Sequence, residues 1–246
     1  MTTADNVLLA GHRLLTDGES RGAVVLAHGF TATAEDPSVT AVALALNGAG
    51  FDVITYDARG HGGSEGESTL GDLEEHDVAA AVAEARTRSD SVVLVGASMG
   101  GIAVLRYAAT HAGIAGLVSV STPARFTLPR TPTAVLTAGM TRTRVGRRLA
   151  SRYLRVQIAA DWNDPDPPID LIGRVSAPVA ILHGERDRFI PPAAAEELYE
   201  RAREPRRVTI VEHMGHAFDD ASTPAIVDAV DWALSATVED QTTVGS

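Results

Sequence analysis

The chain of 246 residues contains no cysteine, and this absence excludes three kinds of chemistry. Without thiols, the protein has no disulfide framework, no thiolate-bound zinc and no cysteine nucleophile. Lysine is absent as well, so all 21 basic residues are arginines, and the 32 acidic residues leave a net charge of −11. An acidic chain of this kind argues against nucleic acid as the main partner.

Two kinds of hydrophobic segment are also missing. The N-terminal residues lack the basic start and apolar run of a signal peptide, and no stretch of about 18 apolar residues could span a membrane. We therefore expect a soluble, cytoplasmic protein. Aromatic residues make up only 4% of the chain, which disfavours a substrate site built on ring stacking. The 45% of hydrophobic residues is enough to form the core of one large domain, which we place over residues 1–246.

Short apolar segments rich in β-branched residues alternate with segments of helical spacing. The apolar segments, which suit strands buried on both faces, are residues 23–29, 52–58, 91–97, 116–121, 179–185 and 206–212. The helical segments are residues 38–50, 72–88, 99–113 and 192–204. This alternation predicts an α/β fold with a mostly parallel sheet of about eight strands and helices on both faces. Residues 6–16 are expected to add one or two antiparallel strands at the edge.

One strand end carries a chemical motif. Residues 96–100 have the pattern G-x-S-x-G and lie between a predicted strand and a predicted helix. A tight strand-to-helix turn projects the central hydroxyl, that of Ser98, and glycines on either side remove side chains that would collide. A serine hydroxyl needs a base within hydrogen-bond reach, and that base needs an acid to orient it. Asp187 and His216 each follow a later predicted strand, at the sheet edge where ligands bind in open α/β sheets.

Five segments, in this order, resemble the signature segments of the α/β-hydrolase fold family, especially its compact esterase, lysophospholipase-like and haloperoxidase-like members. They are HGF (28–30), YDARGHGGSEG (56–66), GASMGG (96–101), GERDRFIPP (184–192) and GHAF (215–218). The resemblance covers nearly the whole chain except residues 123–172. It implies the family's fold, with a short helical lid inserted in that interval.

The resemblance also implies roles for individual residues. Ser98 would be the nucleophile, His216 the general base and acid, and Asp187 the carboxylate that orients the imidazole. The backbone N–H groups of Phe30 and Met99 would form the oxyanion hole.

Two of these positions have neighbouring rivals. His213 competes with His216, and Glu185 competes with Asp187. The family's Gly-His pair and its Gly-x-x-Asp spacing favour His216 and Asp187.

The favoured function is a serine hydrolase that cleaves a carboxylic ester through an acyl-enzyme on Ser98, with no metal and no cofactor. Thioester hydrolysis, acyl transfer, amide cleavage and carbon–carbon bond hydrolysis remain open, because they use the same nucleophile and differ in pocket shape. A non-catalytic ligand-binding protein on the same fold is the rival from a different class.

The inserted segment is the part of the sequence expected to set substrate choice. Between Pro123 and Ala160 it holds eight arginines and no acidic residue. On a helix, one stripe would carry Arg144, Arg148, Arg152 and Arg155, and the adjacent stripe would carry Val145, Leu149, Tyr153 and Val156. Trp162, Arg144 and Arg148 are the candidate substrate-binding residues here.

Three interpretations of this basic segment compete, given in the order in which we favour them. The arginines pair with the acidic body of the same protein. They form a rim that attracts a small acyl substrate carrying a carboxylate or phosphate. The helix makes contact with a membrane surface.

Overall fold

A computed structural model describes residues 1–126, 139, 141–160 and 165–243 of the chain, with side chains up to residue 236. Its centre is a seven-stranded sheet with the order β1-β3-β2-β4-β5-β6-β7. The strands are β1 (Gly11–Leu14), β2 (Ala23–Ala27), β3 (Asp52–Tyr56), β4 (Val92–Ala97), β5 (Gly116–Val120), β6 (Val179–Gly184) and β7 (Arg206–Val211). Only β1 runs antiparallel to its neighbour. The predicted fold class is therefore confirmed.

The sheet differs from the prediction in its number of strands. About eight strands were expected and the sheet has seven. Residues 6–16 contribute one antiparallel edge strand, β1, in agreement with the one or two expected there. Leu8 forms only an isolated bridge with Thr2. The short polar β1 and the partly exposed β7 form the two edges, whereas β2 to β6 are buried along their whole length.

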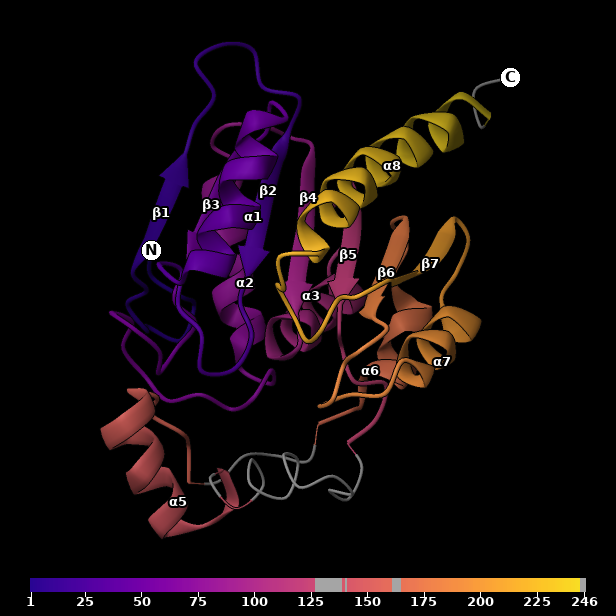
Figure 1. The fold of residues 1–246 in the computed structure, drawn as a ribbon. Helices are drawn as coiled ribbons and strands as arrows, with labels where there is room; N and C mark the ends of the chain where they lie inside the picture. The colour runs from indigo at the N-terminus through magenta and orange to yellow at the C-terminus, as the bar shows by residue number, and fades with distance from the viewer. Residues whose placement is uncertain (127–138, 140, 161–164, 244–246) are drawn as a thin grey trace.

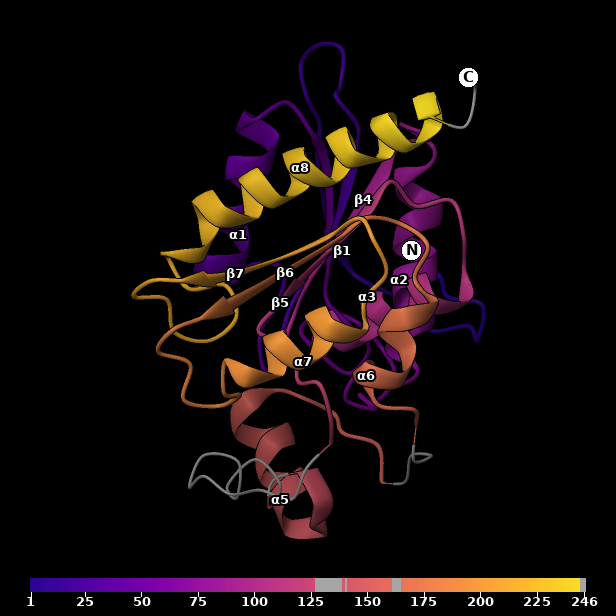
Figure 2. The same cartoon turned by 90° about the vertical axis from the view of Figure 1, so that its right-hand side faces the viewer.

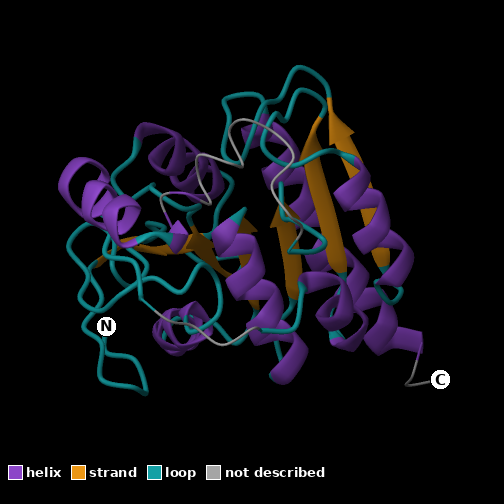
Figure 3. Cartoon of the chain, turned by 90° about the horizontal axis from the view of Figure 1, so that it is seen from below, coloured by secondary structure: helices purple, strands orange, loops and turns teal. Residues whose placement is uncertain are grey.

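Helices cover both faces of the sheet (Figures 1, 2 and 3). One face is covered by α1 (Pro37–Gly48) and α8 (Ser222–Thr243). The other is covered by α2 (Glu74–Ala85), α3 (Met99–Thr110), α6 (Pro168–Leu171) with a following 3₁₀ turn, and α7 (Ala193–Arg201). Two apolar clusters, one on each face, make up the core.

The inserted segment lies beyond the carboxyl ends of the central strands (Figures 1 and 2). Its described part contains α5 (Arg144–Leu149) and a π-helical turn at Ala150–Leu154, which we call together the α5 segment. The residues that follow hold this segment against the body of the protein. The amide of Gln157 donates to the carbonyl of Gly60. The amide of Ser68 donates to the carbonyl of Gln157, and the amide of Ala159 donates to the carbonyl of Ser68.

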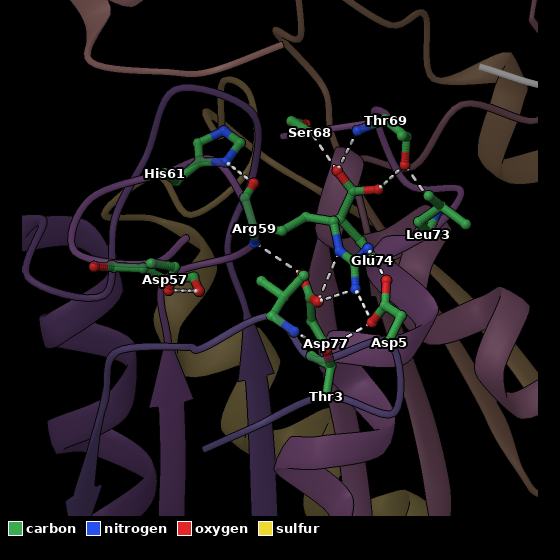
Figure 4. A network of polar contacts seen from close by, with 12 residues as sticks. Thr3, Asp5, Asp57, Arg59, His61, Ser68, Thr69, Leu73, Glu74 and Asp77 are labelled. Carbon is green, nitrogen blue, oxygen red and sulfur yellow. Dashed lines mark hydrogen bonds and ion pairs between the residues drawn. The ribbon is translucent and has the colours of Figure 1, made fainter. Parts of the chain in front are cut away.

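A buried polar network braces the loop between β3 and α2 (Figure 4). The Arg59 side chain, only 3% exposed, forms ion pairs with Asp77 at 2.8 Å and with Asp5 at 2.7 Å. Glu74, the first residue of α2, accepts hydrogen bonds from Ser68, Thr69 and Gly71 of the same loop. Burial raises the pKa of Asp77 to about 7, although the hydrogen bonds from Arg59 act in the opposite direction. This network fixes the loop that lies beside the α5 segment.

No helix in the described part of the chain is long and apolar enough to cross a bilayer.

Candidate active site

Ser98 lies in a strained turn between β4 and α3. Its φ of 52° and ψ of −112° are rare for a residue with a side chain. The turn is held from both sides, because the Ser98 amide donates to the carbonyl of Val120 at 2.9 Å and its carbonyl accepts from Ile102 at 3.0 Å. The strained backbone leaves the Ser98 side chain partly exposed although its neighbours are buried.

The two glycines of the motif are required by close approaches. A Cβ atom on Gly100 would collide with the carbonyl oxygens of Ala27 and His28, and one on Gly96 would collide with the carbonyl of Gly100. The start of α3 therefore packs directly against the end of β2. The G-x-S-x-G pattern is explained by this contact between backbones.

The structure brings Ser98, His216 and Asp187 together in one hydrogen-bonded series. Nε2 of His216 lies 3.1 Å from Oγ of Ser98, and Nδ1 lies 2.7 Å from Oδ2 of Asp187. The other carboxylate oxygen of Asp187 accepts from the amides of Phe189 at 2.8 Å and Ile190 at 2.9 Å. A hydroxyl, an imidazole and a fully buried carboxylate in this order can transfer a proton away from the serine.

The rival residues lie elsewhere. The exposed side chain of His213 is hydrogen-bonded to Arg186 at 2.7 Å and lies 3.9 Å from the exposed Glu185. Among the described contacts, none joins His213 or Glu185 to Ser98.

His183 is a residue of this site that the sequence analysis did not identify. It is fully buried at the end of β6, and its Nε2 lies 3.4 Å from Oδ2 of Asp187 and 3.0 Å from the carbonyl of Ile190. Both neighbours are acceptors, so Nε2 carries a proton and donates it. The spacing His-x-x-x-Asp was visible in the sequence, but a histidine within a buried strand gives no sign that it contacts a carboxylate.

The ionisation of Asp187 follows from these contacts. Burial raises the pKa of this carboxyl, but the hydrogen bonds from His183 and His216 lower it by a larger amount. The pKa of Asp187 therefore lies well below the usual range. Asp187 therefore carries a negative charge at neutral pH, next to the imidazole of His216.

The amides predicted for the oxyanion hole belong to Phe30, in the loop after β2, and Met99, the first residue of α3. A Cβ atom on Gly29 would lie 3.5 Å from Cβ of Ser98, so this loop runs beside the serine. Within the described residues, neither amide is hydrogen-bonded to an acceptor. The first N–H groups of a helix have no partner inside the helix and are suited to bind an anion.

Two buried histidines hold the loop that carries Phe30. The Nδ1–H of His28 donates to the carbonyl of Gly29 at 2.8 Å, and Nε2 accepts from the amide of Ala58 at 2.9 Å. His61 donates to the carbonyl of Arg59 at 3.0 Å and accepts from the amide of Thr31 at 3.4 Å. Both rings act as acceptors at Nε2, so both are neutral.

The neutral state of His28 predicts a loss of stability in acid. Burial, with the neighbouring His61, lowers the pKa of His28 to about 4. In the unfolded chain, His28 takes up a proton near pH 6.5. The contribution of neutral His28 to the free energy of unfolding is therefore complete above that pH and is lost as the pH falls towards 4. The free energy of unfolding, measured by urea titration, should lose about 3 kcal/mol from this residue over that interval.

The variant His28→Asn removes the titrating group and should flatten this slope. His12→Asn, at an exposed position, should leave the slope unchanged. An equal slope in the wild type and in His28→Asn would contradict the prediction.

Of the candidate residues of the insertion, Arg144 and Arg148 are not brought into this cluster. Arg144 and Arg148 are exposed on α5, and no contact between described residues joins them to Ser98, Asp187 or His216. Trp162 lies outside the described residues. The substrate-binding role of these three residues stays a prediction.

The structure shows which face of the basic helix packs on the body of the protein. The inward face of the α5 segment consists of the small residues Gly146 and Ala150, whereas Val145, Leu149 and Tyr153 face outward. Only Val156 of the predicted apolar stripe is buried, in a small cluster with Ala150 that contacts Phe30. The helix changes to a π turn at Ala150, so the stripe does not continue to Val156 as a regular helix would carry it.

Comparison with known proteins adds family information to this geometry. Residues 18–166 match the profile of the family Hydrolase_4, described as "Serine aminopeptidase, S33". The uncharacterized protein YqkD of Bacillus subtilis is 29% identical over 180 residues, which cover 68% of this chain and 56% of YqkD. The chain thus spans little more than half the length of that relative.

A monoacylglycerol lipase of Mycolicibacterium smegmatis is 28% identical over an alignment of 259 positions, gaps included. The alignment covers 89% of this chain and 90% of the lipase. Among solved structures, the Pyrococcus furiosus esterase Pf2001 superimposes with a TM-score of 0.74 at 20% identity, covering 95% of this chain and 89% of the esterase. This second likeness supports the fold.

Proposed function

Because this chain belongs to the Hydrolase_4 family of α/β-hydrolases, whose relatives include esterases and monoacylglycerol lipases, we propose that it is a serine esterase that acts through an acyl-enzyme on Ser98. The observation that carries the proposal is the continuous series of contacts from Ser98 through His216 to Asp187, with distances of 3.1 Å and 2.7 Å. The metal-free chemistry of this triad is sufficient for ester cleavage.

In the proposed mechanism, Oγ of Ser98 attacks the carbonyl carbon of the ester while Nε2 of His216 takes the hydroxyl proton. The negative charge of Asp187 stabilises the imidazolium that forms. The tetrahedral oxyanion is held by the amides of Phe30 and Met99, and each such donor contributes roughly 3 kcal/mol to lowering the barrier in comparable enzymes. His216 then protonates the departing alcohol, and a water molecule hydrolyses the acyl-enzyme by the same steps.

We also propose that residues 123–172 form a lid-like insertion within a single domain. The support for this is the position of the α5 segment beyond the carboxyl end of β4 (Figure 1), which Ser98 directly follows. The buried cluster of Ala150, Val156 and Ile158 contacts the side chain of Phe30. The insertion thus lies against the loop that carries one of the two proposed oxyanion donors.

The proposed substrate class is an ester of a fatty acid with a small alcohol, such as a monoacylglycerol. The support is the similarity to the Mycolicibacterium smegmatis lipase over nine-tenths of both chains. Thioesters and acyl acceptors other than water use the same triad and differ from this proposal in the leaving group or the acceptor.

A series of p-nitrophenyl esters from acetate to palmitate tests the proposal. We expect release of p-nitrophenol with a clear optimum in acyl chain length, because the depth of a pocket favours one length over others. A fluorophosphonate probe should label one site, which mass spectrometry of peptides should locate at Ser98.

An aminoacyl p-nitroanilide serves as the comparison substrate, since the family description names an aminopeptidase. Faster cleavage of the anilide than of every ester would show that the protein is a peptidase and not an esterase. Absence of both hydrolysis and labelling would favour a ligand-binding role.

A further inference from the structure

The outward face of the α5 segment is apolar, although the segment lies on the surface. Val145 is 66% exposed, Leu149 is 49% exposed and Tyr153 is 73% exposed. These residues are spaced four apart, so they form one stripe. Because Gly146 and Ala150 make the inward contacts, this stripe is not needed to hold the segment in place.

Four arginines flank this stripe without an acidic partner in the part of the chain that the structure describes. Arg144, Arg148, Arg152 and Arg155 are exposed, and none forms an ion pair with a carboxylate of the described residues. By contrast, Arg125, nearer the start of the insertion, pairs with Glu197 at 3.0 Å. The interpretation that the arginines pair with the acidic body therefore holds for Arg125. It does not hold for these four arginines within the described part of the chain.

The charge of the whole chain makes this surface distinctive. Eight of the 21 arginines and no acidic residue lie between Pro123 and Ala160, whereas the net charge of the chain is −11. An anionic surface would attract the α5 segment and repel the rest of the molecule, which would fix the orientation of docking.

We propose that the α5 segment docks on an anionic phospholipid bilayer. Val145, Leu149 and Tyr153 enter the boundary between headgroups and acyl chains, and the flanking arginines contact lipid phosphates. A soluble polyanion would use the arginines but leave the apolar stripe exposed, and a neutral partner would use the stripe but leave the arginines unpaired. A bilayer with anionic headgroups matches both features together.

This docking would turn the carboxyl ends of the strands towards the membrane, since the α5 segment lies beyond them (Figures 1 and 2). The site around Ser98 would then face the lipid. The docking itself does not depend on the proposed esterase activity, so it can be tested without a substrate.

Flotation with phosphatidylcholine vesicles, with and without phosphatidylglycerol, provides the test. We expect the wild-type protein to float with the anionic vesicles and to remain in solution with the neutral ones. The triple variant Arg144→Gln/Arg148→Gln/Arg152→Gln should bind the anionic vesicles roughly 100-fold more weakly, at about fivefold per arginine near the surface. The triple variant Val145→Ser/Leu149→Ser/Tyr153→Ser should lose about tenfold or more.

Matched controls use the same substitutions at other exposed positions. Leu44→Ser, on α1 and 57% exposed, and Arg203→Gln, after α7, should bind like the wild type. Circular dichroism should show the wild-type spectrum for every variant, because all the substituted side chains are exposed. Inorganic phosphate should not compete, since a single free anion does not engage the apolar stripe.

Three results would overturn the proposal. One is failure of the wild type to float with anionic vesicles, and another is equal binding to neutral and anionic vesicles. The third is wild-type binding by the serine triple variant, which would indicate simple adsorption of arginines to any polyanion.

Discussion

Replacing Ser98 with alanine is expected to lower kcat for the best p-nitrophenyl ester by roughly 10⁴-fold to 10⁶-fold. The reason is that no other hydroxyl is hydrogen-bonded to His216 within the described residues, so the acyl-enzyme cannot form. The fold should be retained, because alanine keeps the backbone contacts of the turn. Initial-rate kinetics, combined with circular dichroism of the variant, measures both effects.

The same geometry predicts how His216 behaves. His216→Ala should reduce kcat about as strongly as Ser98→Ala, and the double variant should be no worse than either single one, because the residues act as a unit. Ser235→Ala, at an exposed serine on α8, is the matched control and should retain wild-type kinetics. Hydrolysis within about tenfold of the wild-type rate in purified, folded Ser98→Ala would exclude Ser98 as the nucleophile.

The second large effect concerns stability and arises at Arg59. The variant Arg59→Leu should lower the free energy of unfolding by about 3–5 kcal/mol at pH 8, because it leaves the fully buried carboxylate of Asp77 without its partner. Protonation of Asp77 would relieve part of this cost. Since burial already raises the pKa of Asp77 to about 7 and the loss of Arg59 raises it further, the variant should lose less stability at pH 5 than at pH 8.

A matched control is available on the surface. Arg13 forms an ion pair of similar length, 2.8 Å, with Glu84, but the Arg13 side chain is largely exposed. Arg13→Leu should therefore cost less than about 1 kcal/mol. Urea unfolding of both variants at the two pH values makes the comparison. Equal losses in the free energy of unfolding for Arg13→Leu and Arg59→Leu would show that the buried ion pair stabilises the fold no more than the exposed one.

The features that the sequence predicted well are those that depend on local backbone geometry. The buried strands follow from continuous apolar segments. The turn at Ser98 follows from two glycines, because Gly100 permits α3 to touch β2 and Gly96 permits the end of β4 to touch the backbone of Gly100. Asp187 and His216 were found because each follows a strand, and strands of one parallel sheet end at the same edge. Their mutual contact is a consequence of sheet order, which places β6 and β7 beside one another.

The features that the sequence did not predict depend on which surface a side chain meets. His183 contacts Asp187 only because the chain turns after β6 and brings the carboxylate back over the strand end. The orientation of the α5 segment could not be predicted, because hydrophobic periodicity marks only the largest apolar stripe. It does not reveal that the small residues Gly146 and Ala150 permit closer packing of the backbone.

Ser98, Asp187 and His216 come from turns after three different strands, and Ser98 and His216 are 118 residues apart in the chain. Local structure alone cannot bring them within hydrogen-bond distance, because β4, β6 and β7 must first occupy their places in the sheet. Recovery of activity during refolding would therefore report the arrival of the last of these strands rather than the first collapse of the core. In this chain, the site can form only after all three strands are in place in the sheet.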